Sequence, residues 1–121
     1  MFARDLHVLL AILTTVAAVI ATLEGAVRLV RGYPAGRAAG RTRTAVVMSA
    51  AMTATAGIAL VISGKHPHEW LHLIYAALAF SLIPLADNAA STLRSDRGKA
   101  LVRVGGGFTC LIVLVRLFAT G

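Results

Sequence analysis

Residues 65–86 read KHPHEWLHLIYAALAFSLIPLA, and this stretch decides the fold. Its first eleven residues, Lys65 to Tyr75, hold three of the four histidines and the only tryptophan of the chain. The rest is a nearly continuous apolar run, and an apolar helix of about 20 residues is long enough to span a bilayer. Histidine and acidic side chains at the end of such a span carry a free-energy cost, so their presence there points to a function such as ligand binding. The stretch therefore predicts a membrane helix over residues 68–93 with functional residues at one end.

The composition predicts that the whole chain is a membrane bundle. Hydrophobic residues make up 58% of the 121 residues and charged residues 14%, with a mean hydropathy of +0.80. A soluble domain carries about 25% charged residues. Three further apolar segments cover residues 6–30, 45–63 and 100–119, and short connections make sequence neighbours antiparallel. Residues 1–121 are therefore expected to form one transmembrane domain, an all-α, integral membrane four-helix bundle with up-down-up-down topology.

The basic residues that give the chain its net charge of +7 are unevenly placed along the sequence. Nine of the twelve lie in or beside two connections: Arg28, Arg31, Arg37, Arg41, Arg43, Arg94, Arg97, Lys99 and Arg103. Basic residues gather in cytoplasmic loops of membrane proteins. We therefore expect a multi-pass protein of the inner (plasma) membrane, with these loops cytoplasmic and both termini outside (N-out/C-out). This pattern accounts for the charge without a nucleic-acid partner, and the lipid bilayer is the expected surrounding.

Two histidines are predicted to lie at the same depth near the outer face. His7 opens the first span, and His72 sits about one turn into the third. Two neutral imidazoles from different helices can bind one haem iron from opposite sides. Arg116 reaches the same level in the fourth span and would pair with a haem propionate, while Tyr75 could pack at the ring edge. The alternative is that both histidines are interfacial residues with satisfied hydrogen bonds.

The histidine that opens span one and the sequence Leu-His-Leu-Ile-Tyr-Ala-Ala-Leu-Ala that opens span three resemble small membrane b-type cytochromes. The layout is also similar to one four-helix half of haem A synthase and to cytochrome b561-like and copper-resistance-D-like bundles. The resemblance covers the whole chain as an architecture. It implies electron transfer rather than catalysis, through haem b held by His7 and His72. Spans two and four hold no histidine, so one haem is expected, with a redox protein or quinone as partner and a homodimer or larger complex as the assembly.

A second motif shares the same residues. His68-Glu69-Trp70-Leu71-His72 has the form H-E-x-x-H, which on a helix places two histidines on one face with Glu69 as a possible base for zinc-bound water. A zinc protease would need a third ligand, for which His66 or His7 could serve. A non-catalytic zinc or copper site built from His66, His68, Glu69 and His72 is the simpler alternative. A solvated outer turn also explains His66 and His68.

A glutamate within the first predicted span makes two further functions worth considering. Glu24 and Arg28 lie one helical turn apart in span one, and Asp87 in span three is expected at a similar depth, so the three could form a network. Small multidrug-resistance exporters resemble this chain in length, span number and a glutamate in the first span. Aromatic content of 6% argues against their cation-binding cage. A structural or accessory bundle without its own chemistry is the remaining alternative.

Overall fold

The computed structural model describes residues 2–32, 36–65, 67 and 70–120, and every regular element in these ranges is a helix. The helices are α1 (Phe2–Arg31), α2 (Arg37–Ile62), α3 (Leu71–Ser91) and α4 (Asp96–Thr120). All four are long and apolar enough to cross a membrane. Helix α1, with 30 residues, is roughly 45 Å long, so it exceeds a hydrocarbon layer of about 30 Å.

The four predicted helices are confirmed, but three of them begin earlier than expected. Helix α1 begins at Phe2 instead of residue 6. Helix α2 begins at Arg37 instead of residue 45, because its first two turns are polar and look like a loop in hydropathy. Helix α4 begins at Asp96 instead of residue 100. Ser95 caps it, since its hydroxyl accepts a hydrogen bond from the Gly98 amide at 2.9 Å. Helix α3 begins at Leu71, three residues after the predicted start, and follows Trp70 in a turn.

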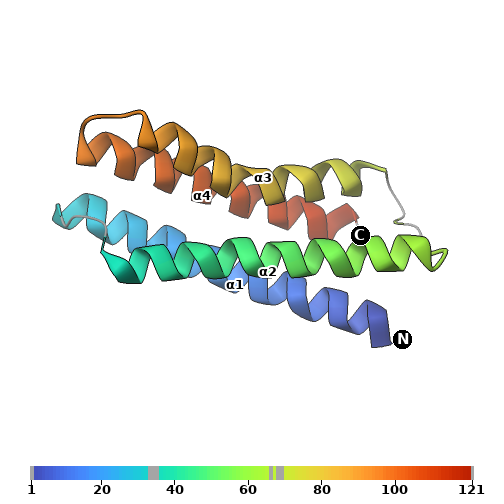
Figure 1. Cartoon of the computed structure of the whole chain (residues 1–121). Helices are drawn as coiled ribbons and strands as arrows, with labels where there is room; N and C mark the ends of the chain where they lie inside the picture. The colour runs from blue at the N-terminus through green and yellow to red at the C-terminus, as the bar shows by residue number, and fades with distance from the viewer. Residues whose placement is uncertain (1, 33–35, 66, 68–69, 121) are drawn as a thin grey trace.

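The helices alternate in direction, and Figure 1 shows that α1 begins and α4 ends at the same end of the bundle. Helices α1 and α2 lie side by side in one layer, and α3 and α4 in the other. Each helix packs against two neighbours: α1 contacts α2 and α4, while α3 contacts α4 and α2. Helices α1 and α3 therefore stand on one diagonal of the bundle. The end opposite the termini carries the α1–α2 and α3–α4 connections.

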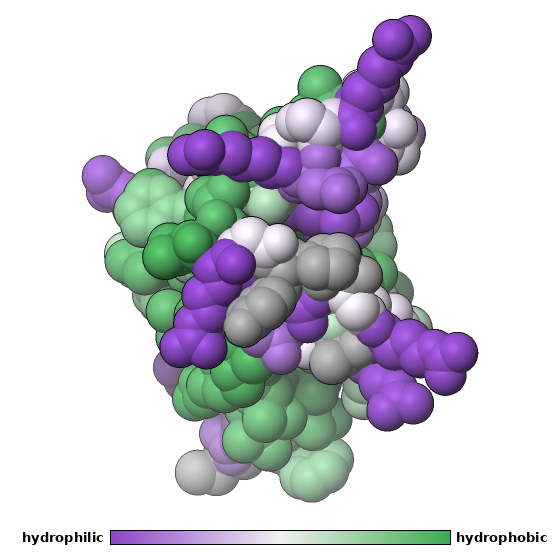
Figure 2. Space-filling view, turned by 90° about the vertical axis from the view of Figure 1, so that its left-hand side faces the viewer, coloured by the Kyte–Doolittle hydropathy of each residue, from purple (hydrophilic) through white to green (hydrophobic). Residues whose placement is uncertain are grey.

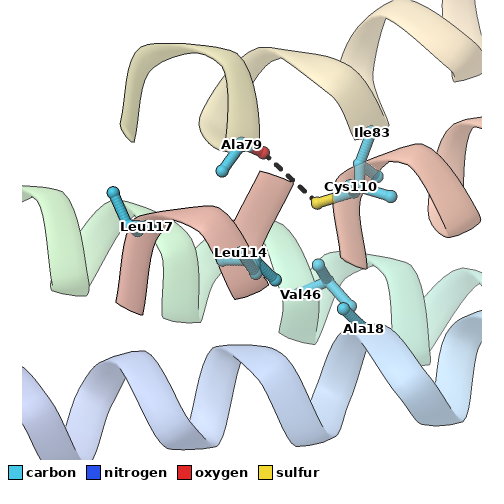
Figure 3. Packing of buried hydrophobic residues seen from close by; sticks show 7 residues of the cluster. All are labelled: Ala18, Val46, Ala79, Ile83, Cys110, Leu114 and Leu117. Carbon is cyan, nitrogen blue, oxygen red and sulfur yellow. Dashed lines mark hydrogen bonds between the residues drawn. The ribbon is translucent and has the colours of Figure 1, made fainter. Parts of the chain in front are cut away.

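The interior of the bundle mixes small side chains with a few larger aliphatic ones, while many large apolar side chains face outward. The core cluster consists of Ala18, Val46, Ala79, Ile83, Cys110, Leu114 and Leu117, contributed by all four helices (Figure 3). The Cys110 thiol points to the Ala79 carbonyl at 3.6 Å and so links α4 to α3. Leu9, Leu13 and Leu23 of α1 are about half exposed. This distribution suits a lipid surrounding, where small residues bring helices together and apolar ones meet the bilayer.

Two adjacent glycines bring α4 close to both of its neighbours. A side chain at Gly106 would collide with the Cβ atom of Ala86 in α3, and one at Gly107 would lie 2.5 Å from the Thr22 hydroxyl in α1. Nothing lies within 4 Å of the corresponding position at Gly105. Gly106 and Gly107 are therefore required by helix packing, and Gly105 is not.

Candidate functional site

The structure brings the imidazoles of His7 and His72 together at the end of the bundle where the termini lie. His7 is in the second turn of α1, and His72 is in the first turn of α3. Their ring centroids are 6.4 Å apart, and the ring planes are tilted by 57°. Because α1 and α3 are diagonal partners, the two side chains reach toward each other across the bundle. The two residues meet at similar depth, as turn counting predicts.

The protonation pattern of His7 follows from its hydrogen bond. Its Nδ1 lies 3.1 Å from the backbone carbonyl oxygen of Thr53 in α2. A carbonyl oxygen only accepts, so Nδ1 carries a proton, and in the neutral ring the lone pair is on Nε2. Metal-bound histidines are commonly oriented in this way by a carbonyl. Gly57 makes room for the ring, since a Cβ atom there would be 3.1 Å from His7 Cε1.

His72 has a nitrogen that lacks a partner. Its Nδ1 is buried, and no hydrogen-bonding group among the described residues reaches it. The ring also interacts with the backbone of Leu117 in the last turn of α4, where helix carbonyls have no partner within the helix. A buried nitrogen without a partner is uncommon in proteins and calls for an explanation such as a bound ion or group.

The spacing of the two rings fits a shared metal ion. Imidazole nitrogens bind a metal ion such as zinc at about 2.0–2.1 Å, so two rings on opposite sides of one ion have centroids roughly 6 Å apart. The buried residues of α1 are small, namely Ala11, Thr14 and Ala18. The arrangement can supply two neutral nitrogen ligands in a mostly apolar setting.

The other predicted site residues have different positions. Tyr75 is partly buried and packs against the core cluster. Arg116 is exposed beside the buried Leu117, and within the described ranges it forms no ion pair. His66, His68 and Glu69 lie outside the described residues. In the part of the chain that is described, no three histidine, cysteine or acidic side chains gather as a metal site.

At the opposite end of the bundle, Asp87 connects three helices. It forms an ion pair with Arg43 of α2, and its Oδ1 lies 3.3 Å from Arg103 Nε of α4. The expected network of Asp87 with Glu24 and Arg28 did not include these two arginines, which are the ion-pair partners of Asp87 in the structure. Sequence reasoning missed this role of Arg43 and Arg103. Arg43 was predicted to lie in a connection and Arg103 beside one, while the structure places Arg43 in α2 and Arg103 in α4.

A cavity of about 270 Å³ lies at this same end and is bounded by all four helices. Its charged lining residues are Glu24, Arg28, Arg43, Asp96, Lys99 and Arg103. Figure 2 looks onto this end and shows hydrophilic side chains spread around it, with apolar side chains along the flanks. The sequence indicated that basic residues cluster at this end of the bundle, but it did not indicate that they line a cavity.

Comparison with protein-family models, curated proteins and solved structures finds no match for this chain. The site is therefore interpreted from its own geometry.

Proposed function

We propose that this protein is a membrane b-type cytochrome that carries electrons through one haem held by His7 and His72. Haem b would supply reversible one-electron transfer when bound. The haem end would face the outside, and the basic connections would face the cytoplasm across the inner (plasma) membrane. A redox protein or a quinone would exchange electrons with it, within a homodimer or a larger complex.

The observation that carries the proposal is the pair of imidazoles with centroids 6.4 Å apart on diagonal helices. Both rings have one nitrogen without a described hydrogen-bond partner: the Nε2 lone pair of His7, and the buried Nδ1 of His72. The other nitrogen of His7 contacts the Thr53 carbonyl oxygen, and such a contact holds a ligand ring in one tautomer and one orientation. This set of donors fits a group that needs two neutral nitrogen ligands.

The surrounding residues would control access and charge. Ala11 and Ala79, both buried, keep the surroundings of the pair apolar and restrict water. An apolar shell and the hydrogen bonds of the ligands tune the potential of a bound metal. Tyr75 would pack at the edge of the group. Arg116, exposed at the same end of α4, would pair with a propionate.

The cavity at the opposite end disfavours the exporter function. Four of its six charged lining residues are basic, namely Arg28, Arg43, Lys99 and Arg103. A site for a lipophilic cation needs aromatic faces or excess negative charge. The cavity near Glu24 has neither, because its other lining residues are small or aliphatic.

Absorption spectroscopy of the purified full chain tests the proposal. We expect a Soret band, a sharp alpha band after reduction, and one haem per chain. His7→Ala and His72→Ala should each lose the bands while helix content, measured by circular dichroism, stays unchanged. Arg116→Gln should keep the bands but shift the reduction potential, because a positive charge near the haem is removed.

His66→Ala and His68→Ala serve as matched controls, since they remove the other two histidines of the sequence and leave His7 and His72 in place. Both should keep the full spectrum. The purified protein could instead be colourless and contain stoichiometric zinc or copper. If His68→Ala lost that metal, the proposed haem would be rejected in favour of the H-E-x-x-H metal site. Retention of haem in the double variant His7→Ala, His72→Ala would also reject the proposed ligands.

A further inference from the structure

The cavity at the basic end of the bundle has the size of a headgroup. Its volume is about 270 Å³. Pockets for drug-sized ligands are larger, at about 300–1,000 Å³. The cavity therefore suits a small polar group. It lies at the opposite end of the bundle from His7 and His72, so its occupant is distinct from the proposed haem.

The lining provides positive charge that is not fully neutralised. Arg43 and Arg103 share the carboxylate of Asp87, which leaves two guanidinium groups against one anion. Lys99 also lines the cavity, and among the described residues no group pairs with its ammonium. Guanidinium and ammonium groups are the usual partners of phosphate oxygens. The cavity is thus complementary to a phosphate.

Glu24 adds a second requirement on the other side of the same cavity. Its Oε2 is buried, and no donor among the described residues reaches it. A buried carboxylate oxygen without a donor is costly, so an occupant that supplies an N–H or O–H group would stabilise it. The lining is therefore complementary to one small group that carries both a phosphate and a hydrogen-bond donor.

Aliphatic residues complete the lining, among them Ala21, Val46, Ile83 and Val104. The flanks of the bundle are apolar just below the hydrophilic end (Figure 2). Basic pockets between membrane helices are known to bind lipid headgroups at this depth. We propose that the cavity binds a phosphodiester headgroup carrying a donor, of the ethanolamine or glycerol type, with its acyl chains along the apolar flank.

Binding of defined lipids to the full chain in detergent, measured by native mass spectrometry, tests this site. We expect phosphatidylglycerol and phosphatidylethanolamine to bind about tenfold more tightly than phosphatidylcholine, whose headgroup has no N–H or O–H donor. A factor of this size is expected from one hydrogen bond to a charged group. Equal binding of all three lipids to the wild-type chain would overturn the proposal.

Two substitutions separate the two requirements. Glu24→Met should remove the discrimination against phosphatidylcholine, because the acceptor for the donor group is lost. Lys99→Met should weaken the binding of all three lipids by about tenfold, because a contact to the phosphate that they share is lost. Arg97→Met is the matched control, since Arg97 is an exposed residue in the first turn of α4 that does not line the cavity. If Arg97→Met weakened binding as much as Lys99→Met, nonspecific surface charge would explain the result and the proposed site would be rejected.

The same chemistry could come from a soluble phosphate ester, and competition distinguishes the two sources. Glycerol 3-phosphate at millimolar concentration should not displace bound phosphatidylglycerol if the acyl chains contribute to binding. Displacement by glycerol 3-phosphate that depends on Lys99 would identify a soluble ester as the ligand of the same phosphate site and reject the lipid. Haem content should be unchanged in Glu24→Met and Lys99→Met, so the outcome is independent of the proposed cytochrome function.

Discussion

At the scale of single residues, the hydroxyl groups of Thr14 and Thr53 form the polar contact between α1 and α2 next to His7. Their Oγ1 atoms are 3.0 Å apart and buried. Each hydroxyl also donates to a carbonyl in its own helix, Thr14 to Leu10 and Thr53 to Ser49, both at 2.8 Å. A hydroxyl has one proton, so two protons serve three hydrogen bonds. The contact between the helices must therefore compete with the bonds within them.

This competition predicts weak coupling between the two threonines. In a double-mutant cycle with Thr14→Val and Thr53→Val, we expect a coupling free energy of about 0.6 kcal/mol, the average for interhelical hydrogen bonds in a membrane protein. Unfolding by SDS in mixed micelles provides the measurement. Thr55→Val is the control, because Thr55 is exposed and bonds only to Ala51 of its own helix, at 2.9 Å. A coupling above about 2 kcal/mol would contradict the proton count.

The same cycle should leave His7 undisturbed. His7 Nδ1 bonds to the backbone carbonyl of Thr53, and valine keeps that carbonyl. A side-chain acceptor could have been suspected from the sequence, but a backbone acceptor has no sequence signature. For this reason the depth of the two histidines could be predicted by counting helical turns, whereas the tautomer of His7 required the structure.

At the scale of helices, the packing of α4 depends on which glycine faces a neighbour. Ala at Gly106 would place a methyl group against the Ala86 side chain, so we expect Gly106→Ala to destabilise the bundle by about 1–3 kcal/mol. Gly105→Ala should be neutral or stabilising by up to about 1 kcal/mol, because the site is open and alanine favours helix. SDS-induced unfolding of the two variants gives the comparison.

A compensating substitution in α3 tests whether the contact with Ala86 causes the loss of stability in Gly106→Ala. Ala86→Gly combined with Gly106→Ala exchanges the two sides of the contact and should recover most of the stability lost in Gly106→Ala alone. If the double variant were as unstable as the sum of the single variants, the close contact between α3 and α4 would not be the source of the loss.

The helix ends show where sequence reasoning was limited. The four apolar segments and the similar depth of His7 and His72 could be predicted, because both depend on hydropathy and on counting helical turns. The polar turns from Arg37 to Thr44 belong to α2, but hydropathy cannot distinguish a polar helical turn from a loop. That error also hid the partners of Asp87, since Arg43 was assigned to a connection instead of a helix.

At the scale of the whole molecule, the polar chemistry is divided between the two ends. The imidazole pair lies at the end with the termini, and the cavity with its basic residues lies at the other. Between them the interior holds apolar side chains and the hydroxyl groups of Thr14 and Thr53. The positive charge at one end therefore specifies the proposed orientation, because cytoplasmic retention of lysine and arginine governs insertion.

Cysteine labelling tests that orientation, because the native Cys110 is 2% exposed and adds little background. Ser63→Cys places a thiol in the exposed turn after α2, and Thr92→Cys places one in the exposed connection after α3. In spheroplasts, a membrane-impermeant maleimide should label Ser63→Cys before lysis and Thr92→Cys only after it. The unsubstituted chain is the control for Cys110. The reverse order of labelling, or equal labelling of both sites before lysis, would contradict the orientation and would move the histidine pair away from the outer face.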